Sequence, residues 1–378
     1  MAPCMIRGTV IMRDAVSRRT FVGSALGTAL AAGVCLSSEE AYADASAQEG
    51  VDVASLAAGA ALALPSDVAG LPTIMAQPFA EVAPGSQTDA LEGLVFDRGG
   101  AMYVCHRFRE KVDGEEVTSS EICRIDEAGA VERFIYKANA SFNGIAIHED
   151  GRFFVADMSG HIWLYPEGGA EEPLGELSLD VPDAATKILP NDLVFDANTG
   201  DLYFVNFNAS MLNPTGGVYR ASAESDYQSI NEVIGGLVTP NGITFDSACS
   251  SLYVSETGLN RIIKVSLKDG VANPGFLGCC VVYQGQGTHG PDSSRLDASG
   301  NFYQAFYPAG RAVIFNADMV AVANVVPFDR ADHAGWKTSS LALHPTKPEG
   351  YLISGGERGM WVLKFDALAA SAPLWHLV

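Results

Sequence analysis

Asn241-Gly-Ile-Thr-Phe-Asp246 is one of six copies of a short pattern, in which a polar residue precedes an apolar strand and a closing Asp or His. The other copies are Glu92-Gly-Leu-Val-Phe-Asp97, Asn143-Gly-Ile-Ala-Ile-His148, Asn191-Asp-Leu-Val-Phe-Asp196, Asp292-Ser-Ser-Arg-Leu-Asp297 and Ser339-Ser-Leu-Ala-Leu-His344. In chain order the copies start 51, 48, 50, 51 and 47 residues apart. A regular period of about 50 residues is typical of a solenoid or a propeller.

The sequence after each copy predicts further strands. A turn such as Arg98-Gly-Gly100 leads to an aromatic strand such as Met102-Tyr-Val104, and third strands follow in several units, at 161–165, 217–220, 261–265 and 311–315. Units of this kind are propeller blades, so the sequence predicts an all-β fold, a six-bladed β-propeller over residues 71–378. We expect the segment Pro72-Thr-Ile-Met-Ala-Gln-Pro-Phe79 to supply the outer strand of the last blade, because closure removes exposed sheet edges.

Residues 1–43 are interpreted as an export signal. The run Ser17-Arg-Arg-Thr-Phe-Val22 is followed by an apolar stretch as far as Leu36 and by the small-x-small site Ala41-Tyr-Ala43. That order is typical of a twin-arginine signal, and the apolar stretch of about 16 residues is too short for a stable membrane anchor. We therefore expect a linker over residues 44–70, transfer by the twin-arginine export machinery, and a location in the periplasm, the cell envelope or outside the cell.

The amino-acid composition limits the classes of binding partner that the protein can have. Hydrophobic residues make up 48% of the chain and charged residues 18%, which indicates a globular protein with a sizeable core. Asp and Glu number 45 against 24 Lys and Arg, a balance that disfavours nucleic acid as a partner and suits cations or neutral substrates. The cysteines after residue 43 show no Cys-x-x-Cys and no metal-type Cys/His spacing, so we expect buried free thiols.

The first residues of the six copies form the candidate site, because equivalent positions of the innermost strands converge on the channel of a propeller. These residues are Glu92, Asn143, Asn191, Asn241, Asp292 and Ser339. Oxygen donors without His or Cys suit a hard cation, calcium above all. The alternative is that the Asn-Gly and Asp-Ser pairs are turns between blades. Polar residues at one position of all six copies favour a calcium site in the central channel. The closing Asp and His residues are interpreted as turn residues that hydrogen-bond the hairpin backbone.

Longer motifs are similar to those of a known family. They include Leu91-Glu-Gly-Leu-Val-Phe-Asp97, Asn213-Pro-Thr-Gly-Gly-Val-Tyr219, Ser255-Glu-Thr-Gly-Leu-Asn-Arg261 and Gly310-Arg-Ala-Val-Ile-Phe-Asn316. From about Gly70 to Lys364 the chain resembles the calcium-dependent six-bladed propellers of the senescence marker protein, gluconolactonase and diisopropylfluorophosphatase group. Within that group it is most similar to the staphylococcal drug-responsive lactonases.

The resemblance implies roles for single residues. Matching positions make Glu92, Asn191, Asn241 and Asp292 the calcium ligands, with Asp292 as the catalytic proton-transfer residue. Substrate or channel contacts fall on Asn143, on Ser293 beside the site, and on His289 and His333, for which a surface loop is the alternative. A second, structural calcium is not predicted, because the stretch that would hold it differs here.

The resemblance also implies an activity. We expect an exported, calcium-dependent hydrolase, a lactonase that opens a small lactone ring with metal-activated water. Two alternatives stay open: a phosphotriester hydrolase, and a non-catalytic, calcium-stabilised propeller that binds a ligand or a protein, since a fold does not determine a function.

Overall fold

The computed structural model describes residues 68–377 apart from 87–88, 182–183, 185, 288–289, 329–336 and 357–358. The export signal predicted for residues 1–43 lies outside the described residues, as do His289 and His333. No described helix has the length and apolar character needed to cross a membrane. The described chain folds into antiparallel β-sheets with short 3-10 helices, which confirms the predicted all-β fold.

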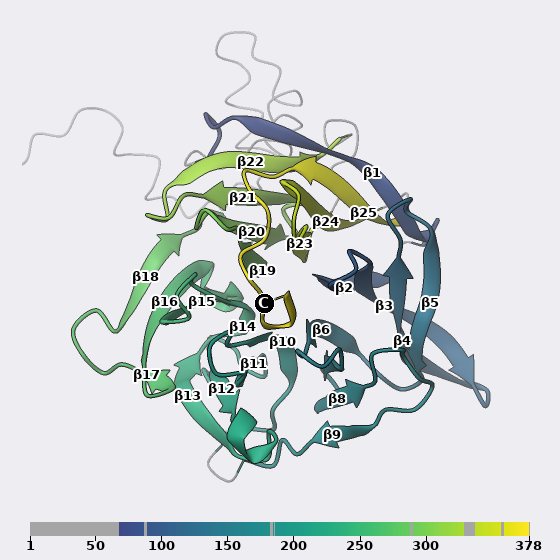
Figure 1. Cartoon of the computed structure of the whole chain (residues 1–378), viewed down its shortest axis with the longest axis horizontal. Coiled ribbons are helices and arrows are strands. Elements are labelled where there is room, and N and C mark those ends of the chain that lie inside the picture. Colours follow the sequence, from purple (N-terminus) through teal and green to yellow (C-terminus); the bar gives the residue numbers. More distant parts are fainter. Residues whose placement is uncertain are drawn as a thin grey trace, which may run out of the picture. The chain divides into compact units, whose positions relative to one another are not determined.

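Each repeat unit forms one blade of four main strands (Figure 1). Blades 1 to 3 consist of β2 (Ala90–Phe96), β3 (Met102–Val112), β4 (Glu115–Ile125), β5 (Val131–Lys137); β6 (Phe142–Ile147), β7 (Phe153–Asp157), β8 (His161–Tyr165), β9 (Gly175–Leu177); and β10 (Pro190–Phe195), β11 (Leu202–Asn206), β12 (Gly216–Ala221), β13 (Ile230–Leu237). Blades 4 to 6 consist of β14 (Pro240–Phe245), β15 (Ser251–Glu256), β16 (Arg261–Lys268), β17 (Val271–Ala272), β18 (Cys279–Gln284); β19 (Gly290–Leu296), β20 (Phe302–Tyr307), β21 (Arg311–Phe315), β22 (Ala321–Pro327); and β23 (Leu341–Leu343), β24 (Glu349–Gly356), β25 (Gly359–Asp366) with β1 (Thr73–Pro84). The 3-10 helices are η1 (Ala223–Ser225), η2 (Thr257–Leu259) and η3 (Trp375–Leu377).

The blades close into a ring. Each innermost strand, in the order β2, β6, β10, β14, β19 and β23, contacts the next, and β23 contacts β2 (Figure 1). β1 pairs antiparallel with β25, which confirms that the N-terminal segment supplies the outer strand of the last blade. The first residues of β1 also pair in parallel with β22, so this strand joins blades 5 and 6 into one sheet.

The core lies between neighbouring blades. Tyr103 of blade 1 packs edge-to-face against Phe153 of blade 2 at 4.8 Å between ring centroids, and similar apolar clusters fill the other blade interfaces. The packing reaches Val68, which is fully buried within the stretch expected as a linker. Asp297 Oδ1 accepts hydrogen bonds from two backbone amides of its hairpin, which confirms the interpretation of the closing residues as turn residues.

The cysteine prediction is only partly right. The described cysteines are free, and Cys105 and Cys123 are buried, as expected. Cys279, however, is exposed, because β18 is the outermost main strand of blade 4 and presents every second side chain to solvent.

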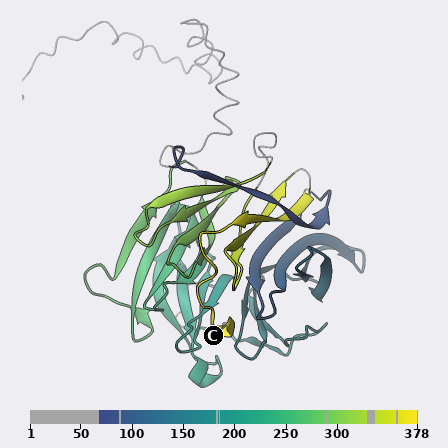
Figure 2. The ribbon, with the colours of Figure 1, turned by 45° about the horizontal axis from the view of Figure 1, so that its top comes forward.

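The segment after β25 crosses one end of the ring (Figure 1, Figure 2). It contacts the C-terminal ends of the innermost strands: Ala372 N donates to Leu296 O at 2.9 Å, and His376 Nε2 bonds Phe96 O at 2.7 Å. Trp375 packs against Phe195. The candidate site residues stand at the opposite, N-terminal ends of these strands.

Candidate active site in the central channel

A β-bulge places five of the six site residues. The register shifts between Glu92 and Leu94 in β2, and comparable shifts occur near the start of β6, β10, β14 and β19. A bulge inserts a residue that does not pair and redirects the side chains beside it. The first residues of these five copies therefore leave the regular alternation of their strands, whereas Ser339 directly precedes Ser340 and β23, which pairs with β24 without a shift.

The glycines of the repeat allow the innermost strands to touch. A Cβ atom on Gly93 would lie 2.1 Å from Asn143 O, one on Gly144 would lie 2.8 Å from Asn191 O, and one on Gly242 would lie 2.3 Å from Asp292 O. Real side chains do not approach so closely. These glycines lie within strands and serve close approach, so the alternative of simple turns between blades is wrong.

Three further contacts complete the circle. Ile243 N donates to Asp192 Oδ2 at 3.4 Å, Ser293 N donates to Ser339 O at 3.0 Å, and the Ser339 hydroxyl donates to Leu91 O at 2.9 Å. The structure thus brings the first residues of all six copies, together with Ser293, into one ring of contacts around the axis.

Arg107 of β3 joins two of these residues and was missed by the sequence analysis. Its Nη1 donates to Asn143 Oδ1 at 2.8 Å, and its Nη2 lies 3.3 Å from Glu92 Oε1. It comes from a second strand, where the repeat marks no site position. The one feature that could have indicated Arg107 in the sequence is its charge, directly after the run Met102–His106, which is buried in the structure.

Buried carboxyl groups give the channel its electrostatic character. Burial raises the pKa of Glu92, against the opposing effect of Arg107. Burial raises the pKa of Asp292 well above its usual range, and the neighbouring charges of Glu92 and Asp192 raise it further. A cation placed among these groups would favour their ionised forms and so stabilise the site.

Two amide oxygens reinforce this conclusion. Asn191 Oδ1 and Asn241 Oδ1 are buried and have no hydrogen-bond partner among the described residues. An unsatisfied buried acceptor costs about 1–3 kcal/mol, so such groups call for an explanation. Together with the carboxylates of Glu92 and Asp292, these oxygens form a donor set that fits calcium.

Two more residues support the site. Asp192 stands at a position where three of the copies have Gly, and this departure could have marked it in the sequence as a site residue. Its Oδ2 atom lies 3.6 Å from Arg295 Nη1. Gln304 is fully buried, and its Nε2 donates to the carbonyl oxygens of Asp292 at 2.8 Å and Ser293 at 3.1 Å. Gln304 therefore holds the backbone of the β19 bulge in place.

Comparisons with known proteins agree with the motifs. The sequence model of the family described as SMP-30/Gluconolactonase/LRE-like region matches residues 91–331. Lactonase drp35 of Staphylococcus saprophyticus is 31% identical over 315 residues, which cover 81% of this chain and 91% of that protein.

Solved structures share the fold. The calcium-binding protein regucalcin of Agrobacterium tumefaciens has a TM-score of 0.57 at 18% identity, covering 80% of this chain and 99% of its own. A gluconolactonase of Xanthomonas campestris has a TM-score of 0.54 at 17% identity, covering 77% and 97%. The resemblance expected from the motifs is confirmed, and the chain belongs to the SMP-30/gluconolactonase/LRE-like family.

Proposed function

We propose that the protein is a calcium-dependent lactonase, which opens a small lactone ring by hydrolysis. The observation that carries the proposal is the pair of unpartnered, buried amide oxygens of Asn191 and Asn241, on innermost strands of the same ring that carries the largely buried Glu92 and the buried Asp292. The relatives support the reaction class, since those with similar sequence or fold are named lactonase and gluconolactonase.

The four ligand residues would hold calcium at the N-terminal ends of the innermost strands. When bound, the ion supplies a Lewis acid that stabilises negative charge developing on the lactone carbonyl oxygen. Asp292 takes a proton from the attacking water and returns it to the oxygen of the leaving alcohol, so one C–O bond forms as another breaks. Gln304 fixes the backbone that carries this carboxyl group.

Polar groups beside the ligands would orient the substrate. Arg107 and Asn143 form a bonded pair next to Glu92, and both present donors that can bind hydroxyl or carbonyl oxygens of a lactone. Ser293 adds a hydroxyl directly after Asp292. His289 and His333 stay predictions for the channel mouth. The C-terminal segment covers the far end of the channel, so we expect substrate to arrive from the end where the strands begin.

The test is hydrolysis of aldono-, alkyl- and aromatic lactones by the purified protein, with calcium and with a chelator. We expect turnover that disappears with chelator and returns with calcium. A phosphotriester belongs in the same panel, because the runner-up enzyme would cleave it through direct attack by Asp292. A folded protein that calcium stabilises, but that cleaves no lactone, would instead support the binding propeller.

Export is proposed separately, on residues 1–43. Fusing these residues to a reporter that is active only after folding in the cytoplasm tests the twin-arginine route. Changing both Arg18→Lys and Arg19→Lys should hold the reporter inside the cell. Continued export of the double variant would contradict the proposal.

A further inference from the structure

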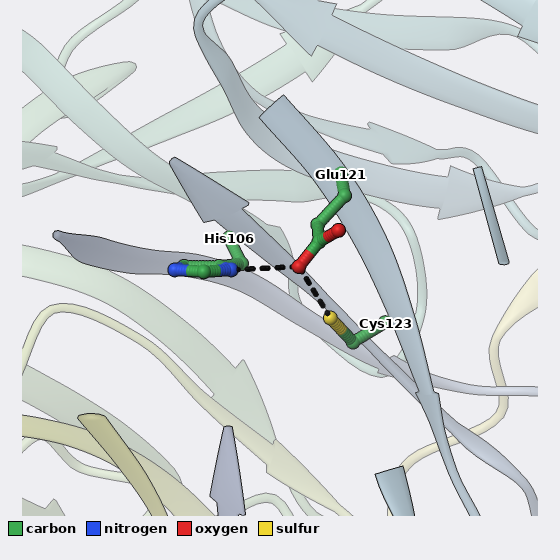
Figure 3. Close-up of side chains that lie close together, drawn as sticks. All are labelled: His106, Glu121 and Cys123. Carbon is green, nitrogen blue, oxygen red and sulfur yellow. Dashed lines mark hydrogen bonds and ion pairs between the residues drawn. The ribbon is translucent and has the colours of Figure 1, made fainter. Parts of the chain in front are cut away.

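A second group of ligand-type side chains lies in blade 1, on β3 and β4 rather than on the innermost strands. His106 on β3 pairs directly with Glu121 on β4, and Cys123 follows two residues later on the same face of the sheet. One nitrogen, one oxygen and one sulfur atom of these side chains lie within 4.8 Å of one another. All three residues are buried, and Figure 3 shows Glu121 between the other two.

The separations are close to those of a metal site. His106 Nδ1 lies 2.9 Å from Glu121 Oε1, which lies 3.5 Å from Cys123 Sγ (Figure 3). Metal–ligand bonds of about 2.0–2.3 Å in tetrahedral geometry place neighbouring ligand atoms roughly 3.3–3.7 Å apart. The two pairs that include Glu121 therefore need only small side-chain rotations, whereas the ligand atoms of His106 and Cys123, which lie within 4.8 Å, would move closer together.

Outer partners already orient two of the ligands. His106 Nε2 bonds Asp89 Oδ2 at 2.9 Å, an arrangement that keeps a proton on Nε2, so a bound cation would replace only the proton that Nδ1 shares with Glu121. Arg133 Nε donates to Glu121 Oε2, which leaves Oε1 for the cluster. Metal-ligating histidines and carboxylates have such partners as a rule.

We propose that His106, Glu121 and Cys123 bind a thiophilic divalent cation, zinc above all, at a site distinct from the channel. Calcium prefers oxygen ligands, whereas imidazole and thiolate select zinc and its neighbours. A neutral imidazole, a carboxylate and a thiolate neutralise a divalent cation, and Asp89 and Arg133 offset one another. Binding displaces the thiol proton of Cys123 and the proton between His106 Nδ1 and Glu121 to solvent, and no oxidation occurs.

The site would also affect the channel. His106 directly precedes Arg107, the residue that bonds Glu92 and Asn143. A cation bound at His106 would tie β3 to β4 beside that residue and restrict its motion. The sequence rules for metal sites missed the cluster because pairing of β3 with β4, rather than linear spacing, brings the ligands together.

The test uses the purified full chain with Cys249→Ser, Cys279→Ser and Cys280→Ser changed first, because these three described thiols are less buried and could bind metal themselves. Cobalt is the probe, since a thiolate ligand gives a charge-transfer absorption band. We expect one cobalt per chain with such a band, displacement by zinc but not by excess calcium, and protection of Cys123 from alkylation.

Variants locate the site. Cys123→Ser and His106→Gln should lose the band, whereas Cys105→Ser, a fully buried cysteine on the other face of β3, should keep it. Asp89→Asn should weaken zinc binding about 10- to 100-fold through its effect on His106. No band in the starting protein, or a band that survives in Cys123→Ser, would overturn the proposal. Native mass spectrometry of zinc stoichiometry gives a second readout that does not depend on activity.

Discussion

Gly242 lies directly against the backbone of Asp292, since a Cβ atom on this glycine would stand 2.3 Å from the Asp292 carbonyl oxygen. The strand that carries Asn241 thus has no room for a side chain at its next position. The distance between these two blades at the axis, and with it the spacing of two proposed calcium ligands, depends on this one glycine.

Gly242→Ala should therefore separate β14 from β19. Overpacking of this kind costs about 1–3 kcal/mol, and we also expect a smaller rise in melting temperature on adding calcium. Gly175→Ala is the matched control, because a Cβ atom there meets nothing within 4 Å, and its stability should stay within about 0.5 kcal/mol of the parent. The idea fails if Gly242→Ala unfolds and responds to calcium as the parent protein does.

The substitution Asn241→Leu tests whether the side chain of Asn241 binds calcium or only supports the fold. The side-chain oxygen of Asn241 is buried without a partner among the described residues, so an apolar residue of similar shape removes an unfavourable group. In chelator we expect unchanged or higher stability than the parent protein. In calcium the stabilisation and the lactonase activity should be lost. Thermal unfolding in both conditions measures this, and a variant still stabilised fully by calcium would remove Asn241 from the ligand set.

Asp292→Asn tests proton transfer. The amide can still offer an oxygen ligand but cannot accept a proton, so we expect kcat to fall about 10²- to 10⁴-fold while part of the calcium-induced stabilisation remains. Asp318→Asn, an exposed position after the third strand of the same blade, serves as the control and should keep full activity. Turnover near the parent value in Asp292→Asn would assign the base elsewhere.

The sequence predicted what each repeat determines locally. A blade forms from strands that follow one another in the chain, so the period and the hairpin turns were enough to locate all six blades and the polar residue at the start of each. The function of Gly93, Gly144 and Gly242 could not be predicted from the sequence, because it depends on how closely two blades approach.

Apart from the closure of the ring by β1, contacts between distant segments could not be predicted. Arg107 reaches the site from a second strand, and the pairing of β1 with β22 depends on how the closing strand crosses from one blade to the next. The cluster of His106, Glu121 and Cys123 depends on the register of a hairpin. In each case the information lies in an alignment of two strands that no local pattern specifies.

The C-terminal segment leads to a prediction about pH. His376 is buried beneath the ring, and its Nε2 bonds the carbonyl oxygen of Phe96. Burial lowers the pKa of His376, and the nearby charge of Arg98 lowers it further, against the hydrogen bond that His376 donates to the Phe96 carbonyl oxygen. The unfolded chain, with an ordinary histidine pKa near 6.5, then binds more protons than the folded protein at mildly acidic pH.

The stability that His376 contributes is accordingly complete above about pH 6.5 and is lost as pH falls toward the lower pKa of the folded state, by about 1.4 kcal/mol for each unit between the two pKa values. His376→Gln keeps a side-chain N–H for Phe96 O but cannot be protonated. We expect its melting temperature to fall less than that of the parent between about pH 7.5 and about pH 5.5. Comparing the two proteins cancels the contributions of the other histidines, including the opposite one of His106, whose pKa its carboxylate partners raise. Parallel curves for parent and variant would show that protonation of His376 does not loosen the segment that covers the channel.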